Sequence, residues 1–318
     1  MTAEFAGPIG LIVNPRSQRN RERLEQLRAI YRSADRIVVR ELANVSEIPD
    51  ALEEFERAGA TLIAVSGGDG TIQATITAML SESGSGRPPL AVLAGGMTNV
   101  IGHQVGIPGK PDSGLAALLA RRKEKRNLKF VRHPVMGVRV APDSDRIYGM
   151  LLGGAGFHDG VMMARKRVHP VGFAQSAAAG IGTAVYYLRT LLGGAGTGHA
   201  MSLTLDDSSR LDRRCYLLLV TCLPGLMLGL DPFWGEGAAP LRWTWVDHPP
   251  RRLAIAAGPL LFGRPLGWML RNGYRSGRAS HIEIESATPL LLDGERIEPR
   301  PGKPIVVDGG FELTFAHL

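Results

Sequence analysis

The feature that most constrains the fold of this chain is an apolar run that leads directly into a glycine-rich turn. Residues 61–65 predict a buried strand, and they are followed by Gly67-Gly68-Asp69-Gly70-Thr71. Residues 72–80 then predict a helix, which ends in the Ser-, Gly- and Pro-rich segment 81–89. Strand–loop–helix units of this kind build parallel sheets that carry helices on both faces.

Further apolar runs repeat this arrangement in the first part of the chain. Residues 9–13, 37–39 and 90–93 predict three more strands. Helices are expected over 20–32, after a cap at Ser46, and after a cap at Asp112 or Ser113. The fold class expected here is therefore α/β, with a doubly wound parallel sheet.

Three loops with distinctive residues each follow one of these strands, at 14–17, 67–71 and 95–99. Ligands of open parallel sheets bind outside the carboxyl ends of the strands. Because all three loops leave such ends, we expect them to meet at one binding site.

The pattern changes near residue 130, where short strand-like runs begin to alternate with turn residues such as 206–208 and 308–310. This alternation is typical of a β-sandwich or barrel, here interrupted by helices near 170–192 and 249–271. The expected strands are 135–140, 203–205, 216–220, 241–246, 281–284, 305–307 and 311–315. We expect an α/β domain over 1–130 and a β-sandwich-rich domain over 131–318, whose last strands could return to the first domain.

The charge balance favours anionic partners, because the formal net charge is +7. Cys215 and Cys222 form no disulfide framework or zinc motif, and the N-terminus lacks the pattern of a signal peptide, so a cytoplasmic location is expected. The uncharged stretch between Arg167 and Arg189 has weak apolarity and predicts a packed or membrane-facing helix rather than a membrane span.

The residue types at positions 67–71 predict a site that binds an anion. Glycines allow close backbone approach, and successive N–H groups at a helix N-terminus attract phosphate. Asp69 would repel phosphate in a simple cradle, but it fits a site where a cation is bound or a hydroxyl proton is removed. The alternative is a tight turn capped by Asp69.

Four motifs in order resemble the diacylglycerol kinase catalytic-domain family, which includes bacterial lipid kinases, sphingosine kinases and ceramide kinases. They are Asn14-Pro15, residues 67–71, a Gly-x-x-x-Asn loop ending at Asn99, and Asp293-Gly294-Glu295. Residues 154–159 also lie where that family has a Gly-Phe-Asp-like segment. The resemblance covers nearly the whole chain, and it implies a nucleotide-binding α/β domain followed by a β-sandwich domain.

The resemblance implies transfer of the ATP γ-phosphoryl group, with Mg²⁺, to the primary hydroxyl of diacylglycerol, ceramide or a sphingoid base. Asp69, Asp293 and Glu295 are the implied catalytic carboxylates, with Glu295 also a Mg²⁺ ligand, and the identity of the base stays open. The implied nucleotide-binding residues are Asn14, Arg16, Ser17, Gly67, Gly68, Asp69, Gly70, Thr71, Gly96, Thr98 and Asn99.

Two departures from the family pattern keep other functions open. The third loop has Val100 where the family has Asp, and Arg16 stands in a first loop that lacks the usual glycine. These changes favour a non-catalytic lipid- or nucleotide-binding regulator as the alternative. An NAD kinase also carries Gly-Gly-Asp-Gly-Thr, but the segment that should follow is absent.

Apolar and aromatic residues beside arginines suggest contact with an anionic membrane in the second half of the chain. The candidates are Leu226, Leu228, Phe233, Trp234 and Trp268, for which ordinary core packing is an equal alternative. The expected partners are a lipid substrate and, peripherally, a membrane surface. A second copy of the chain could also bind, and no nucleic-acid module is present.

Overall fold

The computed structural model describes residues 2–4, 7–81, 87–95, 100–124, 126–168, 198–206, 209–226 and 229–318. Two compact units make up the chain, Met1–Pro134 with Phe311–Leu318, and Val135–Gly310. Two long strands, β6 (Asn127–Arg139) and β16 (Ile305–His317), each begin in one unit and end in the other. The helix predicted near 170–192, with most of the uncharged stretch, lies outside the described residues.

The first unit is built on a parallel sheet, as the apolar runs predicted. Its strands β2 (Ile9–Val13), β3 (Ile37–Glu41), β4 (Leu62–Gly67) and β5 (Leu90–Ala94) lie in the order β3-β2-β4-β5. All three pairings are parallel. The short strand β1 (Thr2–Glu4) pairs with β6 in antiparallel register.

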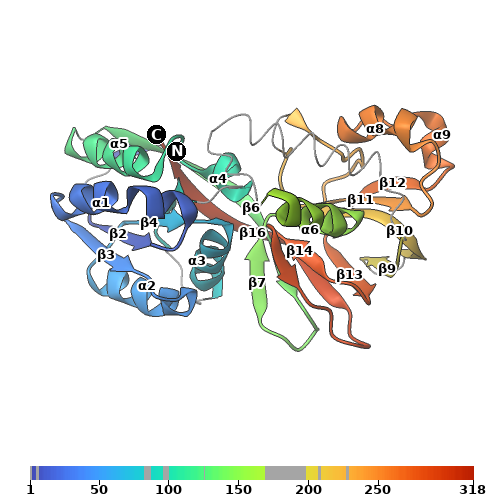
Figure 1. The fold of residues 1–318 in the computed structure, drawn as a ribbon, viewed down its shortest axis with the longest axis horizontal. Coiled ribbons are helices and arrows are strands. Elements are labelled where there is room, and N and C mark those ends of the chain that lie inside the picture. Colours follow the sequence, from blue (N-terminus) through green and yellow to red (C-terminus); the bar gives the residue numbers. More distant parts are fainter. Residues whose placement is uncertain are drawn as a thin grey trace. The chain divides into compact units, whose positions relative to one another are not determined.

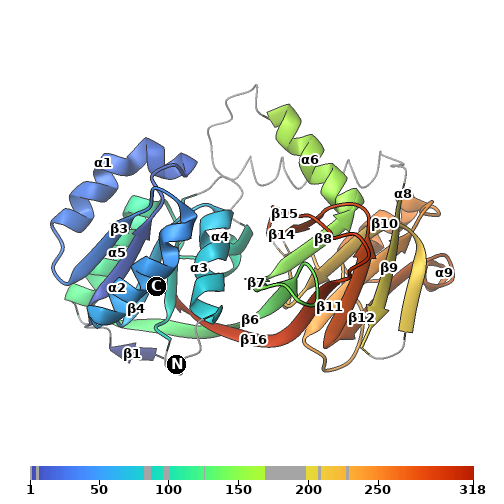
Figure 2. The ribbon, with the colours of Figure 1, turned by 90° about the horizontal axis from the view of Figure 1, so that it is seen from below.

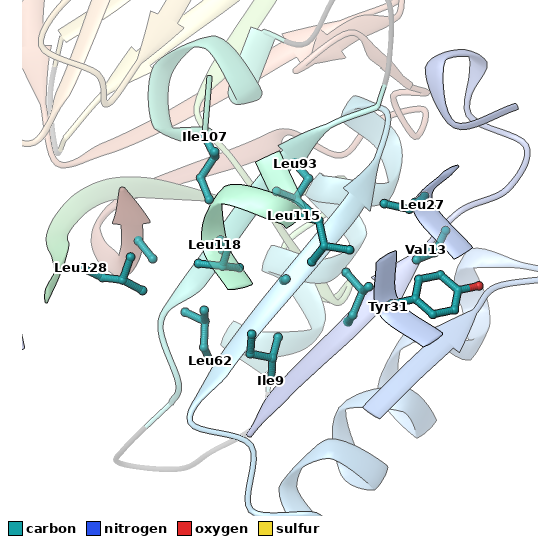
Figure 3. Packing of buried hydrophobic residues seen from close by; sticks show 14 residues of the cluster. Ile9, Val13, Leu27, Tyr31, Leu62, Leu93, Ile107, Leu115, Leu118 and Leu128 are labelled. Atoms are coloured by element: carbon teal, nitrogen blue, oxygen red, sulfur yellow. The ribbon is translucent and has the colours of Figure 1, made fainter. Parts of the chain in front are cut away.

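Helices cover both faces of this sheet, with α1 (Gln18–Arg32) and α5 (Pro111–Lys123) on one side (Figure 1). On the other side lie α2 (Ile48–Arg57) and α3 (Asp69–Ser81), and α4 (Val100–Val105) packs near β5. Leu27 and Tyr31 of α1 and Leu115 and Leu118 of α5 pack onto the buried strands (Figure 3). On the opposite face, Gly10 leaves the space that the Phe55 ring occupies.

Two helix starts differ from the sequence prediction. Ser46 caps no helix: Asn44 caps the 3₁₀ turn Val45–Glu47, where its side chain accepts a hydrogen bond from the Ser46 N–H (3.1 Å), and Glu47 is the N-cap residue of α2. Asp112 and Ser113 lie inside the first turn of α5, whose N-cap is Lys110. The Asp112 carboxylate instead pairs with Arg23 of α1 (2.8 Å).

The second unit is rich in antiparallel strands, which confirms the predicted change of architecture. One path through its sheet runs β15-β14-β8-β10-β9-β13-β16, and β11 joins β10 to β12. Its own strands are β7 (Arg146–Gly149), β8 (Leu151–Ala155), β9 (His199–Leu205), β10 (Ser209–Thr221), β11 (Leu241–Asp247), β12 (Tyr274–Ala279), β13 (His281–Ser286), β14 (Leu290–Leu292) and β15 (Glu295–Ile297). Its helices are α6 (Gly156–Val168), α8 (Leu253–Leu261) and α9 (Gly267–Leu270).

One turn prediction in the second half was wrong, and one predicted helical region is divided in two. Residues 308–310 do not form a turn, because β16 continues through them while Arg139, Arg146 and His281 bind the Asp308 carboxylate. The helix expected over 249–271 is broken into α8 and α9 near Gly263, which has a positive φ of 59°. Within the described ranges, no helix has the length and apolarity needed to cross a bilayer.

The Glu41 carboxylate at the end of β3 fastens α1 to the sheet, and this contact predicts a pH-dependent stability. Arg28 donates two hydrogen bonds to it (2.8 and 2.7 Å), and Tyr31 donates a third. The Arg28 hydrogen bonds are the main reason that the pKa of Glu41 falls to about 2. Because the folded-state pKa is depressed, the stabilisation is present above the unfolded value of 4.5 and is lost as the pH falls toward 2.

We therefore expect Glu41→Gln to lower the free energy of unfolding by about 1 kcal/mol at neutral pH, since the pair is partly exposed. The difference from the wild type should shrink below pH 4.5. Urea unfolding at several pH values measures this, with the exposed Glu56→Gln as the matched control. A difference that does not change with pH would contradict the assignment.

Candidate functional site

The sheet of the first unit has a point where its direction of growth reverses. From β2 the chain adds β3 on one side, and it then adds β4 and β5 on the other side. The carboxyl ends of β2 and β4 therefore flank a topological switch point, which is where such sheets bind ligands. The loops that leave these two ends carry Asn14 and residues 67–71, so the structure brings the first and second predicted loops together, and Gly95 brings the described start of the third loop to the same place.

Asn14 connects the end of β2 with the end of β4 and with α3. Its N–H donates to the Ser66 carbonyl (2.9 Å), and its side-chain amide donates to the Thr71 hydroxyl (2.8 Å). Its side-chain oxygen accepts a hydrogen bond from the N–H of Arg16 (3.0 Å), whose side chain is exposed. Asn14 thus fixes the relative positions of the first and second loops.

Asn20 is a fully buried residue of this site that sequence reasoning missed. Its amide donates to the carbonyls of Asn14 (2.8 Å) and Ser66 (2.9 Å), and its side-chain oxygen accepts the Ser66 hydroxyl (2.9 Å). A signal was present, because Asn20 shares one helical face with the apolar Leu24 and Leu27. A polar residue on that face is expected to satisfy buried backbone groups.

The N-termini of α1 and α3 meet at this point. Ser17 is the N-cap residue of α1, but its side chain makes no bond to its own helix. Its hydroxyl accepts the N–H of Gly68 (3.0 Å), the residue directly before α3. Helix N-termini carry partial positive charge and outward-facing N–H groups, so two converging termini favour an anion.

Two glycines allow these loops to approach one another. A Cβ atom on Gly67 would lie 2.6 Å from the Thr71 Cβ, which is closer than carbon atoms can approach. A Cβ atom on Gly95 would lie 2.8 Å from the Asn20 side-chain oxygen. Gly95 also donates to the Gly67 carbonyl (2.8 Å), which joins the third loop to the second. The predicted Gly96, Thr98 and Asn99 lie outside the described residues.

Asp69, Gly70 and Thr71 form the first turn of α3 rather than a free loop. The Thr71 side chain is only 3% exposed, and its hydroxyl accepts the hydrogen bond from Asn14. Asp69 is half-buried at the first position of the helix, where the helix dipole favours a carboxylate. Thr71 therefore holds the loops in register, while Asp69 is the acidic side chain of this site.

A cavity of about 200 Å³ opens beside Asn14. It is lined by Asn14, Arg16, Leu42, Ala43, Asn44 and Val45. All of these residues belong to the first unit and lie at or just beyond the carboxyl ends of β2 and β3. The cavity is smaller than the roughly 300–1,000 Å³ of typical ligand pockets, so it could hold only part of a larger ligand.

The predicted carboxylates of the Asp-Gly-Glu motif lie in the second unit, in the tight hairpin between β14 and β15. Asp293 and Gly294 both have positive φ (52° and 92°), as a type I′ turn requires. The Asp293 side chain is 2% exposed, and it accepts hydrogen bonds from the N–H groups of Met150 (3.0 Å) and Leu151 (2.9 Å). Glu295, two residues on, is exposed.

Asp159 lies between two histidines at the start of α6. Its carboxylate oxygens are 3.2 Å from His158 Nδ1 and 2.8 Å from His199 Nε2. His158 and Asp159 lie in the segment 154–159 that the family resemblance indicated, whereas sequence reasoning did not find His199, which lies 40 residues after Asp159 at the start of β9. Among the described residues, no group of three acidic, His or Cys side chains is arranged to bind a metal ion.

Most of the residues proposed for membrane contact belong to a core cluster of the second unit. Phe233 is 3% exposed, and Leu226, Trp234 and Trp268 pack partly buried against the same cluster. Leu228 lies outside the described residues. The exposed apolar side chains of this region are different ones, on and between α8 and α9.

Comparisons with known proteins find similarity in the first unit of the chain. Residues 8–132 match the family model of the diacylglycerol kinase catalytic domain. "Probable lipid kinase YegS" of Shigella flexneri is 30% identical over 118 residues, which are 37% of this chain and 39% of that protein. The match therefore spans about two fifths of that relative's length.

Solved structures show the same fold over the full chain. A diacylglycerol kinase from Bacillus anthracis str. Sterne has a TM-score of 0.60 at 17% identity, covering 99% of this chain and 97% of that one. A second structure from the same bacterium has a TM-score of 0.61 at 18% identity, covering 99% and 98%. The family match confirms, for residues 8–132, the resemblance that the motifs indicated.

Asn20→Ala tests whether the buried amide holds the two loops together. The substitution leaves two backbone carbonyls and the Ser66 hydroxyl without their partner, so we expect the free energy of unfolding to fall by about 2–4 kcal/mol. Urea denaturation measures this, and Asn44→Ala at an exposed cap should cost only about 1 kcal/mol. Equal stability of Asn20→Ala and the wild type would contradict the role.

Proposed function

We propose that this chain, in which residues 8–132 carry a diacylglycerol kinase catalytic domain, is an ATP-dependent lipid kinase. It transfers the γ-phosphoryl group of ATP to the primary hydroxyl of a lipid. The observation that carries the proposal is the meeting of the N-termini of α1 and α3, joined by the bond between Ser17 and Gly68 (3.0 Å), at the switch point of the sheet. A phosphate chain fits that position.

The phosphates of ATP would lie against residues 67–71 and the two helix ends, next to the Gly68 N–H that is bonded to the Ser17 hydroxyl (3.0 Å). Arg16 is exposed and Arg19 is half-buried at the start of α1, so their guanidinium groups could pair with phosphate oxygens. Asn14 and Asn20 act indirectly, because their hydrogen bonds keep the first and second loops in place. Positioning and charge neutralisation supply most of the rate in phosphoryl transfer.

Asp69 is the proposed proton acceptor for the lipid hydroxyl. It is half-buried at the head of α3, beside the proposed phosphate position. Mg²⁺ commonly binds one or two carboxylates together with substrate phosphates, and Asp69 fits that requirement at this site. When bound, Mg²⁺ would neutralise phosphate charge. Glu295, an alternative ligand, is exposed in the second unit.

Asp293 is proposed to hold the neighbouring backbone in position rather than to take the proton from the lipid hydroxyl. Its carboxylate binds the N–H groups of Met150 and Leu151, and a Cβ atom on Gly149 would lie 2.4 Å from its Oδ2. These contacts support a role in holding the junction of β7 and β8 against the hairpin that carries Glu295.

The cavity beside Asn14 is proposed to hold the base or ribose of the nucleotide. Its volume of about 200 Å³ suits one ring system rather than the whole of ATP. Its lining by Ala43 and Val45, with the polar Asn14 and Asn44, provides both apolar and hydrogen-bonding contact.

The lipid acceptor is to be identified by direct assay. Pure protein is incubated with labelled ATP, Mg²⁺ and separate preparations of diacylglycerol, ceramide and a sphingoid base. The proposal expects transfer of label to at least one of these lipids. ATP binding without transfer to any lipid would favour the alternative of a non-catalytic regulator. That alternative is suggested by Val100, which stands where the family has Asp.

Asp69→Asn should reduce turnover by about 10²- to 10⁴-fold, the usual contribution of general base catalysis, while the protein stays folded. The rate is measured with the preferred lipid, and unfolding is followed in parallel. Asp50→Asn on the exposed face of α2 is the matched control and should keep the wild-type rate. A folded Asp69→Asn enzyme with normal turnover would remove Asp69 from the mechanism.

Ala43→Phe should fill the cavity and weaken nucleotide binding. We expect the KM for ATP to rise roughly tenfold, equivalent to about 1.4 kcal/mol of lost binding. Ala58→Phe, an exposed alanine at the end of α2, adds the same side chain elsewhere in the unit. If both variants kept the wild-type KM for ATP, the cavity would not be the nucleotide site.

A further inference from the structure

A group of exposed apolar side chains lies in the second unit, on and between α8 and α9, which follow β11 and precede β12 (Figure 1 and Figure 2). We call it the α8–α9 ridge. It consists of Ile255, Phe262, Leu266 and Leu270, which are 60%, 56%, 41% and 54% exposed. Within the described ranges, only Val45 among the other large hydrophobic residues is equally open to solvent.

The sequence of α8 makes both of its faces apolar. Its nine residues, Leu253–Leu261, include no polar side chain. Ala256 and Leu260 are buried in the core cluster with Met269 of α9, whereas Ile255 and Phe262, seven residues apart, share the opposite and exposed face. A surface helix normally presents polar residues to solvent, so an apolar outer face indicates a binding surface.

An open groove lies along the ridge. Its volume is about 480 Å³, and it is lined by Gly258, Pro259, Phe262, Arg264 and Leu266. The lining is formed by the end of α8 and by the segment that leads to α9. The groove is thus apolar, with one guanidinium group among its lining residues.

The chain segment that forms the ridge carries charges of one sign, and the adjacent Asp231, whose N–H donates to the Leu261 carbonyl (2.9 Å), is paired with Arg242 (2.8 Å). Between Asp247 and Glu283 the chain has six arginines and no acidic residue. The six are Arg251, Arg252, Arg264, Arg271, Arg275 and Arg278. Arg275 pairs with Asp247 (2.7 Å), and Arg278 donates to the Ala239 carbonyl (3.1 Å).

The remaining four arginines are exposed, and in the part of the chain that the structure describes none of them makes an ion pair. Arg252 lies 5.8 Å from the ring centroid of Trp268, and Arg251 is 3.4 Å from the Asn272 side-chain oxygen. The ridge is therefore an apolar surface with an uncompensated positive rim, which favours an anionic partner with an apolar layer beneath its charges.

We propose that the α8–α9 ridge docks the second unit on an anionic lipid bilayer. Its apolar side chains enter the boundary between headgroups and acyl chains, and its arginines bind lipid phosphates. The inference rests on the proposed function, because an enzyme whose acceptor is a membrane lipid must reach the bilayer surface. A second copy of the chain is a poorer occupant, since a symmetric contact would bring the same arginines together.

Aromatic residues pack beneath the ridge. Trp268 packs edge-on against the buried Tyr274, with 5.9 Å between the two ring centroids. The Cζ atom of Arg242 lies 5.0 Å from the centroid of the Phe233 ring. These aromatic side chains therefore contact other protein residues. The membrane contacts are assigned to the exposed residues of the ridge, which include Phe262 and Leu266.

Vesicle flotation tests the proposal without requiring catalysis. Wild-type protein should bind vesicles of phosphatidylcholine with phosphatidylglycerol, and bind much less to phosphatidylcholine alone. Arg264→Gln with Arg271→Gln should weaken binding by about fivefold for each arginine removed, and added salt should reduce the wild-type affinity.

Phe262→Ser with Leu266→Ser should also weaken binding to the vesicles, because these substitutions remove the apolar contacts. The charge-matched control, Arg213→Gln with Arg300→Gln, changes two exposed arginines elsewhere in the unit and should bind as the wild type.

An activity assay separates failure of docking from failure of the proposed function. The ridge variants should phosphorylate a dispersed short-chain lipid at the wild-type rate and lose activity on vesicles. If flotation changes as expected but no lipid is phosphorylated in either form, docking stands and the kinase proposal fails.

Vesicle binding that is equal in wild type and ridge variants, or absent in both, overturns the docking proposal. A ridge substitution that changes only the oligomeric state in sedimentation assigns the ridge to a second copy and also overturns it.

Discussion

The candidate site depends on one buried amide. Asn20 satisfies the carbonyls of Asn14 and Ser66, which end two neighbouring parallel strands, and thereby fixes the start of α1 against both strand ends. Buried carbonyls without partners destabilise a fold, so this arrangement is strongly favoured once the sheet has formed. Its consequence is that Ser17 reaches Gly68 and two helix N-termini share one location. The position of the proposed anion site therefore follows from the hydrogen bonds that complete the ends of β2 and β4.

The two units contribute different physical properties. In the first unit, a switch point between parallel strands gathers helix N-termini, a carboxylate and a small cavity. In the second unit, antiparallel strands support an apolar helix pair with an arginine rim, and the hairpin with Asp293 is held by the backbone of Met150 and Leu151. A lipid kinase needs both kinds of surface, because one substrate is a highly charged nucleotide and the other resides in a bilayer.

Local sequence patterns predicted most of the fold but few of the contacts in the site. The strand over 9–13 was predicted with its observed bounds, because a short apolar run with Asn14-Pro15 after it has few alternatives. Asn20 was missed because its partner Ser66 lies 46 residues further along the chain. The turn predicted at 308–310 was wrong because distant side chains bind Asp308 and keep the strand extended.

The sequence did not predict which of two similar residues is buried and which is exposed. Phe233 and Phe262 both lie in apolar stretches of the second half of the chain, yet the first is buried in the core cluster with residues of α8 and α9 and the second is exposed. Only the packing of α8 on the core distinguishes them. In the same way, Asp293 and Glu295 are two residues apart, and the type I′ turn buries one carboxylate and exposes the other.

Amide hydrogen exchange with and without ATP and Mg²⁺ reports where the nucleotide binds. We expect slower exchange in residues 14–20 and 67–72 when ATP is added, since phosphates would occupy the two helix N-termini. Protection confined to other segments, with these two unchanged, would show that the nucleotide binds elsewhere.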